Sequence, residues 1–303
     1  MNQVYQQYPY AKPTFRQRNP KFFLFLMVIG VLLIGNFLLA TWDTLDAKGV
    51  FSGPRLGVVK VEGFIGDATR TTAWIEKLRK DSSVTGVLVR IDSPGGGVAP
   101  SQEVYMAVKR LALAKPVVVS MGSVAASGGY YIAVAGHEIY ASPSTLTGSI
   151  GVRLQVTNVQ GLMERIGITS ESLTTGKFKA SGSPFKELTT EERSYLQTLL
   201  DDMQAEFVET VAAGRNLPKA TVAALADGRV LTGRQALEAK LVDRLGDRQA
   251  ALAGLATLCK AGDDPEILEG PNKQIPWWRE LLSAALDLNA EQTTETAPYQ
   301  FVY

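Results

Sequence analysis

A serine surrounded by small residues is the strongest candidate for a nucleophile in this chain. Residues 120–131 read SMGSVAASGGYY and begin within the apolar run PVVVSMG, which predicts a strand. Ser127 stands directly before Gly128 and Gly129 at an expected helix start, where its side chain can protrude and a substrate backbone can approach closely. A helix N-terminus also favours negative charge that develops there. Ser123 competes less well, because it precedes the helix start and lacks the glycine pair.

A serine nucleophile requires a general base, and the histidine is badly placed for that role. His137 follows Ser127 by about ten residues, roughly 15 Å along a helix axis, so we interpret it as a surface or strand-edge histidine. Lysine can act as a base where burial disfavours its charged form. Lys177 and Lys179 stand in TTGKFKASGSPF with the same strand phase, so these residues alone leave the choice of base open.

Two further glycine-containing turns follow predicted strands, and in open α/β sheets sites form beyond the carboxyl ends of strands. Residues 92–97 read DSPGGG, and successive glycines can present N–H groups to an oxyanion or a phosphate. The pattern matches neither common nucleotide fingerprint, and a plain tight turn is the alternative. Residues 144–152 read STLTGSIGV, where Ser149 either hydrogen-bonds beside the nucleophile or satisfies its own backbone.

The body of the chain alternates short apolar runs with helical patterns, which predicts an α/β fold built from repeated beta-alpha units. Strands begin near residues 56, 87 and 117, a spacing of about 30 residues that suits parallel strands joined by crossover helices. Further strands are expected at residues 138–142, 150–156 and 168–175, and helices at 68–80, 101–113, 128–135 and 159–166, the last with Asn158 as N-cap and Gly167 as C′ residue. A T-x-x-E capping box at residues 189–192 opens a long helix, with an apolar stripe at Tyr195, Leu199, Met203 and Phe207.

An uncharged apolar segment near the N-terminus predicts one transmembrane helix. Residues 22–40 would span roughly 28 Å as a helix, which matches a bilayer core. The segment is longer than the apolar region of a signal peptide and lacks an A-x-A-like end, so a retained anchor is favoured. Basic residues precede it, which predicts a cytoplasmic N-terminus.

The predicted organisation therefore has five parts. They are a cytoplasmic tail at 1–21, a transmembrane anchor at 22–41, a tether at 42–54, a catalytic domain at 55–262 and a C-terminal extension at 263–303. Within the extension, PWWRELLSAALDL suggests an amphipathic helix, and the last dozen residues have the composition of a disordered tail.

Composition argues against several classes of function. The chain carries 31 basic and 30 acidic residues, a net charge of +1, so a surface for nucleic acid is not expected. Cys259 is the single cysteine and His137 the single histidine, which excludes an internal disulfide and makes a metal centre hard to build.

The order of these motifs resembles the signal peptide peptidase A family, whose members are membrane serine-lysine peptidases with a crotonase-like fold related to the ClpP protease. The resemblance covers about residues 56–250 and rests on DSPGGG, GSVAASGGYY, SPSTLTGSIGV, SPFKELTTEER and GRVLTGRQALEAKLVDRLG. It implies Ser127 as nucleophile and Lys179 as base, with backbone N–H groups of Gly96 and Gly128 as oxyanion donors and Ser149 as a support for the lysine. Lys177 becomes a bystander. Ala239 and Lys240 depart from the family pattern, far from the chemistry.

The same resemblance implies substrates, assembly and location. Remnant signal peptides and other hydrophobic peptides would be cleaved at the membrane surface, without a cofactor or metal. A ring-shaped homo-oligomer, expected to be an octamer, would form, with the dyad completed within one protomer or between neighbours. The catalytic domain would lie in the periplasm or outside the cell. The rival interpretations are a crotonase-type acyl-CoA enzyme, which predicts nucleotide binding, and a non-catalytic membrane scaffold.

Overall fold

The computed structural model describes residues 19–46, 54–262, 264–271 and 301–302. These residues belong to two compact units, Met1–Ser52 and Gly53–Tyr303. The first contains helix α2 (Pro20–Asp46), whose window Pro20–Phe37 is long and apolar enough to cross a membrane by length and composition. The helix continues past the predicted end of the anchor, because residues 38–46 contain no proline or glycine. Residues 42–46, expected in the tether, are therefore helical.

The second unit is built on an eight-stranded sheet with strands β7-β5-β3-β2-β1-β9 in order and β4 and β8 attached beside β3. The central strands β1, β2 and β3 run parallel, as do β4, β5, β8 and β9 with their partners, whereas β7 is antiparallel to β5. The bounds of the strands in this sheet are β1 Arg55–Ile65, β2 Val84–Gly96, β3 Val117–Ala126, β4 Glu138–Ala141, β5 Leu146–Gly148, β7 Val230–Thr232, β8 Arg244–Leu245 and β9 Ile267–Gly270.

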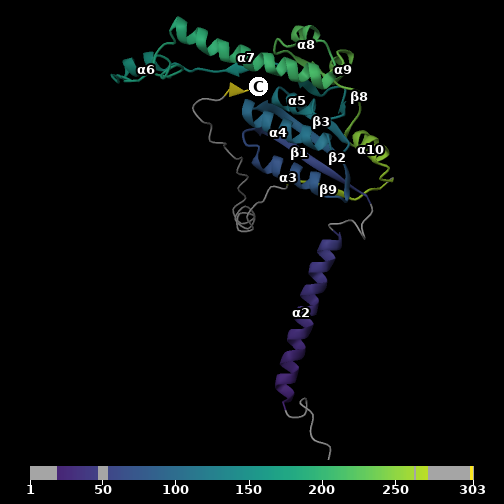
Figure 1. Ribbon diagram of the computed structural model, residues 1–303. Helices are drawn as coiled ribbons and strands as arrows, with labels where there is room; N and C mark the ends of the chain where they lie inside the picture. The colour runs from purple at the N-terminus through teal and green to yellow at the C-terminus, as the bar shows by residue number, and fades with distance from the viewer. Residues whose placement is uncertain (1–18, 47–53, 263, 272–300, 303) are drawn as a thin grey trace, which may run out of the picture. The chain divides into compact units, whose positions relative to one another are not determined.

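Helices connect these strands and cover the sheet (Figure 1). Their bounds are α3 Thr69–Lys80, α4 Val98–Ala112, α5 Gly128–Ala133, α6 Gln160–Arg165, α7 Thr190–Arg215, α8 Lys219–Leu225, α9 Gly233–Glu238 and α10 Arg248–Cys259. The mixed α/β sheet with parallel strands confirms the predicted fold class. The predicted starts of the first three strands are confirmed too, since β1, β2 and β3 begin at 55, 84 and 117.

Side chains of alternate residues on the central strands enter two separate apolar clusters. Val59, Val89 and Val119 belong to the larger cluster, which also contains core residues of α3, α4, α5 and α7. Their neighbours Val58, Leu88 and Val118 belong to the second cluster, with Ala251 and Leu255 of α10. Successive side chains of a strand point to opposite faces, so the sheet is buried on both sides. Burial of both faces holds the ends of β2 and β3 rigidly in place.

Two predicted strands are wrong in whole or in part. Residues 168–175 contain no strand, and Leu173 is 90% exposed, because no apolar surface lies against this segment to reward burial. Of residues 150–156, only β6 (Arg153–Leu154) is a strand, and it pairs outside the main sheet.

The predicted helix starts and ends agree better with the structure than the predicted strands do. The capping box at Thr189 and Glu192 is confirmed, and Gly167 has φ of +75° directly after the end of α6. The N-cap of α6 is Val159 rather than Asn158, although Asn158 Oδ1 accepts a hydrogen bond from the Gln160 N–H at 2.8 Å. The apolar stripe of α7 is buried only in its later part, because Phe207 is fully buried whereas Tyr195 is 40% exposed.

The C-terminal extension is described only in part. The predicted amphipathic helix lies outside the described residues. Within the predicted disordered tail, Phe301–Val302 form strand β10, antiparallel to β6. The rest of that predicted tail lies outside the described residues.

Candidate active site

Ser127 occupies a strained turn between β3 and α5. Its φ of 56° and ψ of −121° lie outside the regions that a serine normally adopts. The turn is held on both sides, because the Ser127 N–H donates to Gly148 O at 2.8 Å and the Ser127 carbonyl accepts from the Tyr131 N–H at 2.8 Å. Such a conformation costs of order 1–3 kcal/mol and is concentrated at functional sites.

The hydroxyl of Ser127 is buried and has no hydrogen-bond partner. The residue is only 3% exposed, and Ser127 Oγ is among the few buried polar side-chain atoms of the described residues that lack a partner. A buried polar atom without a partner costs free energy, so it calls for an explanation such as a catalytic role.

The glycine turn at the end of β2 packs directly against Ser127. A Cβ atom built on Gly95 would lie 2.9 Å from both Gly128 N and Ser127 Cβ, and one built on Gly128 would lie 3.4 Å from Gly96 N. The backbones of the two predicted oxyanion donors therefore meet beside the serine. Only glycine fits at these positions, since Gly95 has φ of +108° and a Cβ on Gly128 would lie 2.3 Å from Ser101 Oγ.

Hydrogen bonds from two buried serines fix the same turn. Ser93 Oγ donates to Gly63 O at 2.5 Å and accepts from the Gly95 N–H at 3.1 Å. Ser101 Oγ donates to Gly97 O at 2.8 Å. Because both serines are fully buried, they cannot move aside for a larger residue. The turn is thus preorganised, as an oxyanion site requires.

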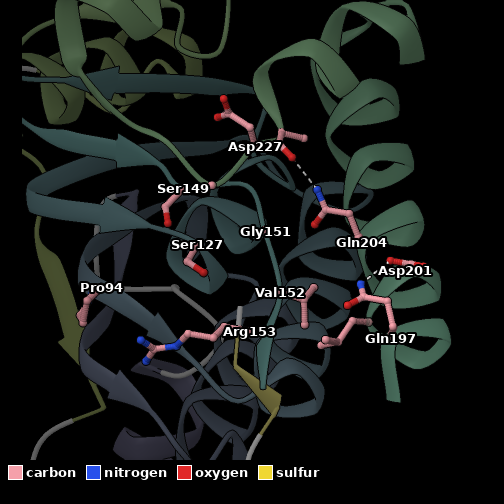
Figure 2. A pocket seen from close by; sticks show the side chains of 13 residues that line it. Pro94, Ser127, Ser149, Gly151, Val152, Arg153, Gln197, Asp201, Gln204 and Asp227 are labelled. Carbon is pink, nitrogen blue, oxygen red and sulfur yellow. Dashed lines mark hydrogen bonds between the residues drawn. The ribbon is translucent and has the colours of Figure 1, made fainter. Parts of the chain in front are cut away.

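Ser149 is the second non-glycine residue with positive φ beside the site. Its φ is 50°, and its N–H donates to Arg229 O at 2.8 Å. The preceding residue, Gly148, accepts the hydrogen bond from the Ser127 N–H, so the two serines lie on adjoining turns. Figure 2 shows their side chains in the same pocket.

The pocket that contains Ser127 has a volume of about 680 Å³, a size suited to a peptide segment or a small molecule. Its walls come from separate parts of the chain (Figure 2): Pro94 and Ser127 from the glycine turns, Ser149, Gly151, Val152 and Arg153 from the segment after β5, Gln197, Leu200, Asp201 and Gln204 from α7, and Ala226, Asp227 and Gly228 after α8.

The rim of the pocket carries an ionised carboxylate, that of Asp227. Hydrogen bonds from the Arg229 side chain and N–H lower the pKa of Asp227 to about 2, so this carboxylate is ionised at neutral pH. Gln197 donates to Asp201 Oδ1 at 2.7 Å, and Gln204 donates to Ala226 O at 2.8 Å. No group of three potential metal-ligating side chains occurs in the described part of the chain.

The two candidate lysines lie in the segment between β6 and α7, residues 155–189, which we call the arm. Figure 1 shows α6 beyond the N-terminal end of α7, away from the central strands. Lys177 Nζ forms an exposed ion pair with Glu191 at 2.8 Å. Lys179 has an exposed side chain, and its N–H donates to Gly176 O at 3.2 Å. The described residues that line the pocket include no lysine.

His137 is far from this site. Its N–H donates to Val117 O at 2.9 Å and its Nδ1 accepts from the Val117 N–H at 3.0 Å, at the start of β3. Ser127 follows the other end of β3, so the strand and helix α5 separate the two residues. The histidine therefore stabilises a strand edge, as the sequence indicated.

The wall formed by α7 was missed by sequence reasoning. Gln197, Asp201 and Gln204 recur at i, i+4 and i+7, a spacing that places polar side chains on one helix face next to the apolar stripe. That signal was present, but a polar face usually meets solvent. Only the tertiary structure, which places this face opposite residues 149–153, makes it a pocket wall.

Comparison with known proteins identifies relatives of this chain. Residues 109–262 match the profile of peptidase family S49. A Synechocystis sp. protein whose name suggests a protease is 45% identical over 217 residues, 71% of this chain and 77% of the relative. Protease 4 of Salmonella typhi is 37% identical, and the chloroplastic serine protease SPPA of Arabidopsis thaliana is 36% identical. The alignments cover 68% of this chain but only 35% and 29% of these two longer proteins.

Proposed function

The chain belongs to peptidase family S49, within the signal peptide peptidase A group of proteases, and on that premise we propose that it is a serine endopeptidase with Ser127 as nucleophile and Lys179 as general base. The observation that carries the proposal is the strained turn that leaves Ser127 Oγ buried, without a partner and beside two glycine amides. Membership of a protease family argues against the acyl-CoA alternative.

The proposed mechanism uses only groups of the protein and water. The uncharged Lys179 amine takes the proton of Ser127 while the oxygen attacks the peptide carbonyl. N–H groups of Gly96 and Gly128 bind the oxyanion, and the lysine then protonates the leaving amine as the C–N bond breaks. Water, deprotonated by the lysine, hydrolyses the acyl-enzyme and restores both groups. Ser149 orients the lysine by a hydrogen bond.

The exposed arm supports assembly as the way in which the dyad is completed. Large apolar side chains are exposed on it: Leu162 62%, Ile166 61%, Ile168 46%, Leu173 90%, Phe178 40% and Phe185 43%. So many exposed large apolar side chains on one segment favour an interface. We expect the arm of one protomer to pack on its neighbour in a ring, in line with the octamer, and to bring Lys179 to the neighbour's Ser127.

The proposed location is a cell membrane, with α2 as a single-pass anchor. The helix has the length and apolar character for a span, and basic residues before it favour a cytoplasmic N-terminus. The catalytic domain then lies outside the cytoplasm. Its substrates would be remnant signal peptides and other hydrophobic peptides left at the membrane after secretion.

A fluorophosphonate probe tests the nucleophile and base directly. The full chain in detergent should be labelled on Ser127, whereas Ser127→Ala should not react and Ser123→Ala, the matched control, should react normally. Labelling of Lys179→Ala should fall by about 10³-fold, as expected for loss of the base, and that of Lys177→Ala should not. A non-catalytic scaffold is not labelled at all. Equal labelling of Lys179→Ala would move the base elsewhere.

Mixing two inactive variants tests completion of the dyad between protomers. Ser127→Ala and Lys179→Ala proteins, unfolded and refolded together, should regain peptide hydrolysis, because each mixed interface can combine an intact serine with an intact lysine. Mixtures that stay inactive, while wild-type protein refolded in the same way is active, would place both residues within one chain.

A further inference from the structure

Gln204 of α7 lines the Ser127 pocket and carries a buried oxygen that has no hydrogen-bond partner. Among the described residues, three buried polar side-chain atoms lack a partner, and two of them, Ser127 Oγ and Gln204 Oε1, belong to residues that line this pocket. The third, Arg248 Nε, belongs to α10. A buried polar atom without a partner costs free energy, so each of them calls for an explanation. The role of nucleophile explains Ser127, whereas Gln204 has no role in the proposed mechanism.

The other end of the Gln204 amide holds the loop that follows α8. Gln204 Nε2 donates to Ala226 O at 2.8 Å, and this bond fixes the orientation of the amide, because a carbonyl oxygen accepts only from the N–H end. Figure 2 draws the bond as a dashed line from Gln204 to the wall beside Asp227. Ala226, Asp227 and Gly228 form this wall of the pocket. Gln204 therefore ties the wall to α7.

The same loop holds Ser149 in a strained conformation. The Ser149 N–H donates to Arg229 O at 2.8 Å, and the Gly228 N–H donates to Ile150 O at 3.2 Å. Ser149 has φ of 50°, in the left-handed region that a serine rarely adopts unless its surroundings hold it there. A displacement of the loop would therefore move the backbone of Ser149 and, with it, the hydroxyl that faces the pocket.

Glutamine is a poor choice at position 204 for packing alone. Methionine has a similar size and would remove the unpaired oxygen. It would leave Ala226 O without this donor, but Ala226 is partly exposed, so water can bind its carbonyl instead. Gln204 is thus the less stable choice for the fold, which points to a role in holding the loop.

We propose that Gln204 is a positioning residue, which through the loop at residues 226–229 keeps Ser149 in place to orient the lysine of the dyad. This inference rests on the proposed function. The contacts run from Gln204 Nε2 to Ala226 O, along the loop to Arg229 O, and from there to the Ser149 N–H. Loss of the first contact should therefore reach the base through Ser149.

A double-mutant cycle tests whether Gln204 acts through Ser149. In the full chain in detergent, Gln204→Met should lower kcat/KM for an internally quenched leucine-alanine peptide by about five- to tenfold, mainly through kcat. It should also displace the limb of the pH-rate profile along which the rate rises with pH. In a Ser149→Ala background the same substitution should change kcat/KM by less than about twofold, because the hydroxyl that Gln204 positions is already absent. Losses that simply multiply overturn the proposal.

Thermal stability separates positioning from an ordinary structural role. The melting temperature of Gln204→Met should equal or exceed that of wild type, since the substitution removes the unpaired oxygen. Gln249→Met, at an exposed position of α10, is the matched control and should change neither kcat/KM nor the pH-rate profile. A lower melting temperature of Gln204→Met with an unmoved pH-rate limb, or an equal loss of activity in the control, overturns the proposal.

Amide hydrogen exchange tests the anchoring without any activity. Mass spectrometry of peptides that cover residues 145–152 should show exchange of the Ser149 N–H about tenfold faster in Gln204→Met, because the acceptor of this N–H lies on the loop that has lost its anchor. Peptides from residues 84–91 of the central strand β2 should keep their wild-type rates. Unchanged exchange at residues 145–152, or equally faster exchange in β2, overturns the proposal.

The exchange and activity measurements separate this inference from the proposed function. If Ser127 is never labelled and no protein hydrolyses peptide, the proposed function fails and the catalytic role of Gln204 fails with it, whereas exchange still decides whether Gln204 holds Ser149. If wild-type protein is active and either the double-mutant cycle or the exchange measurement fails, only the positioning by Gln204 is lost.

Discussion

The turn at Ser127 and the arm that carries Lys179 are held in opposite ways. Ser127 is 3% exposed and lies between strands buried on both faces, beside glycines that admit no larger residue. Lys179 is exposed, on a segment whose Leu173 is 90% exposed. One part of the proposed dyad is preorganised by the core, and the other has little tertiary support within its own chain. The contrast teaches that the fold of one chain orders the turn at Ser127 far more than it orders the surroundings of Lys179.

The largest effect should follow from the addition of a methyl group to the rigid turn at Ser127. Gly128→Ala puts a Cβ atom 2.3 Å from the buried Ser101 Oγ, which cannot yield. We expect a loss of about 1–3 kcal/mol in the free energy of unfolding and a fall of about 10²–10³ in kcat as an oxyanion donor shifts. Denaturant unfolding and peptide hydrolysis measure the two. Gly161→Ala on the arm is the matched control, because nothing lies within 4 Å of its Cβ, and it should change neither.

A charge on the arm should act on assembly rather than on folding. Leu173→Asp is expected to lower the oligomeric mass in light scattering and to reduce activity by about tenfold at low protein concentration, since a charge buried without a partner at an interface is costly. The melting temperature should stay unchanged. Leu113→Asp, at a site 83% exposed beside α4, is the control. If the two variants behave alike, the arm is not an interface.

Ser149 tests whether the rigid side also positions the base. Ser149→Ala keeps the backbone turn but removes the hydroxyl, and we expect kcat/KM to fall by about tenfold, the worth of one hydrogen bond. If Ser149 positions the lysine, the Ser149→Ala substitution also displaces the limb of the pH-rate profile along which the rate rises with pH. A purely structural role leaves that limb in place. Ser144→Ala, outside the residues that line the pocket, serves as control.

The smallest effect should come from the junction of the arm with α7. The ammonium of Lys186 and the Thr189 N–H donate to Glu192 and lower the pKa of this buried carboxyl. Since the folded-state pKa is depressed, the stabilisation is present at neutral pH and is lost as pH falls below about 4, through the folded-state value. Glu192→Gln should cost about 1 kcal/mol at pH 7, from urea unfolding, and the difference from wild type should shrink as the pH falls through the folded-state pKa. If the difference in the free energy of unfolding does not change with pH, the ion pair with Lys186 does not stabilise the fold.

Most of the central fold was predictable because its signals are local. Apolar runs of strand length, spaced for crossover helices, gave β1, β2 and β3, and the Thr189 capping box gave the start of α7. The expected strand at 168–175 failed for a non-local reason. Residues 168–175 have strand propensity, but a strand would form there only against an apolar surface. The described chain supplies no such surface beside this segment.

The features of the candidate site also divide into those that local sequence signals predict and those that depend on distant parts of the chain. The small residues around Ser127 already indicated a sharp and closely packed turn, because such a backbone tolerates little else, but they predicted a protruding side chain where the structure has a buried one. The polar wall of α7 and the pairing of β6 with β10 could not be derived from pattern.

The sequence by itself determined the family, the glycine-rich turn at Ser127, the apolar N-terminal helix and the parallel sheet. Tertiary structure alone decided that Ser127 Oγ is buried without a partner, that the side chain of Lys179 is exposed, and that residues 301–302 pair with Arg153 and Leu154. The physical reason is the distance along the chain over which each kind of interaction acts. Propensity, capping and glycine turns act over a few residues, whereas burial and edge pairing depend on which distant segments the completed fold brings together.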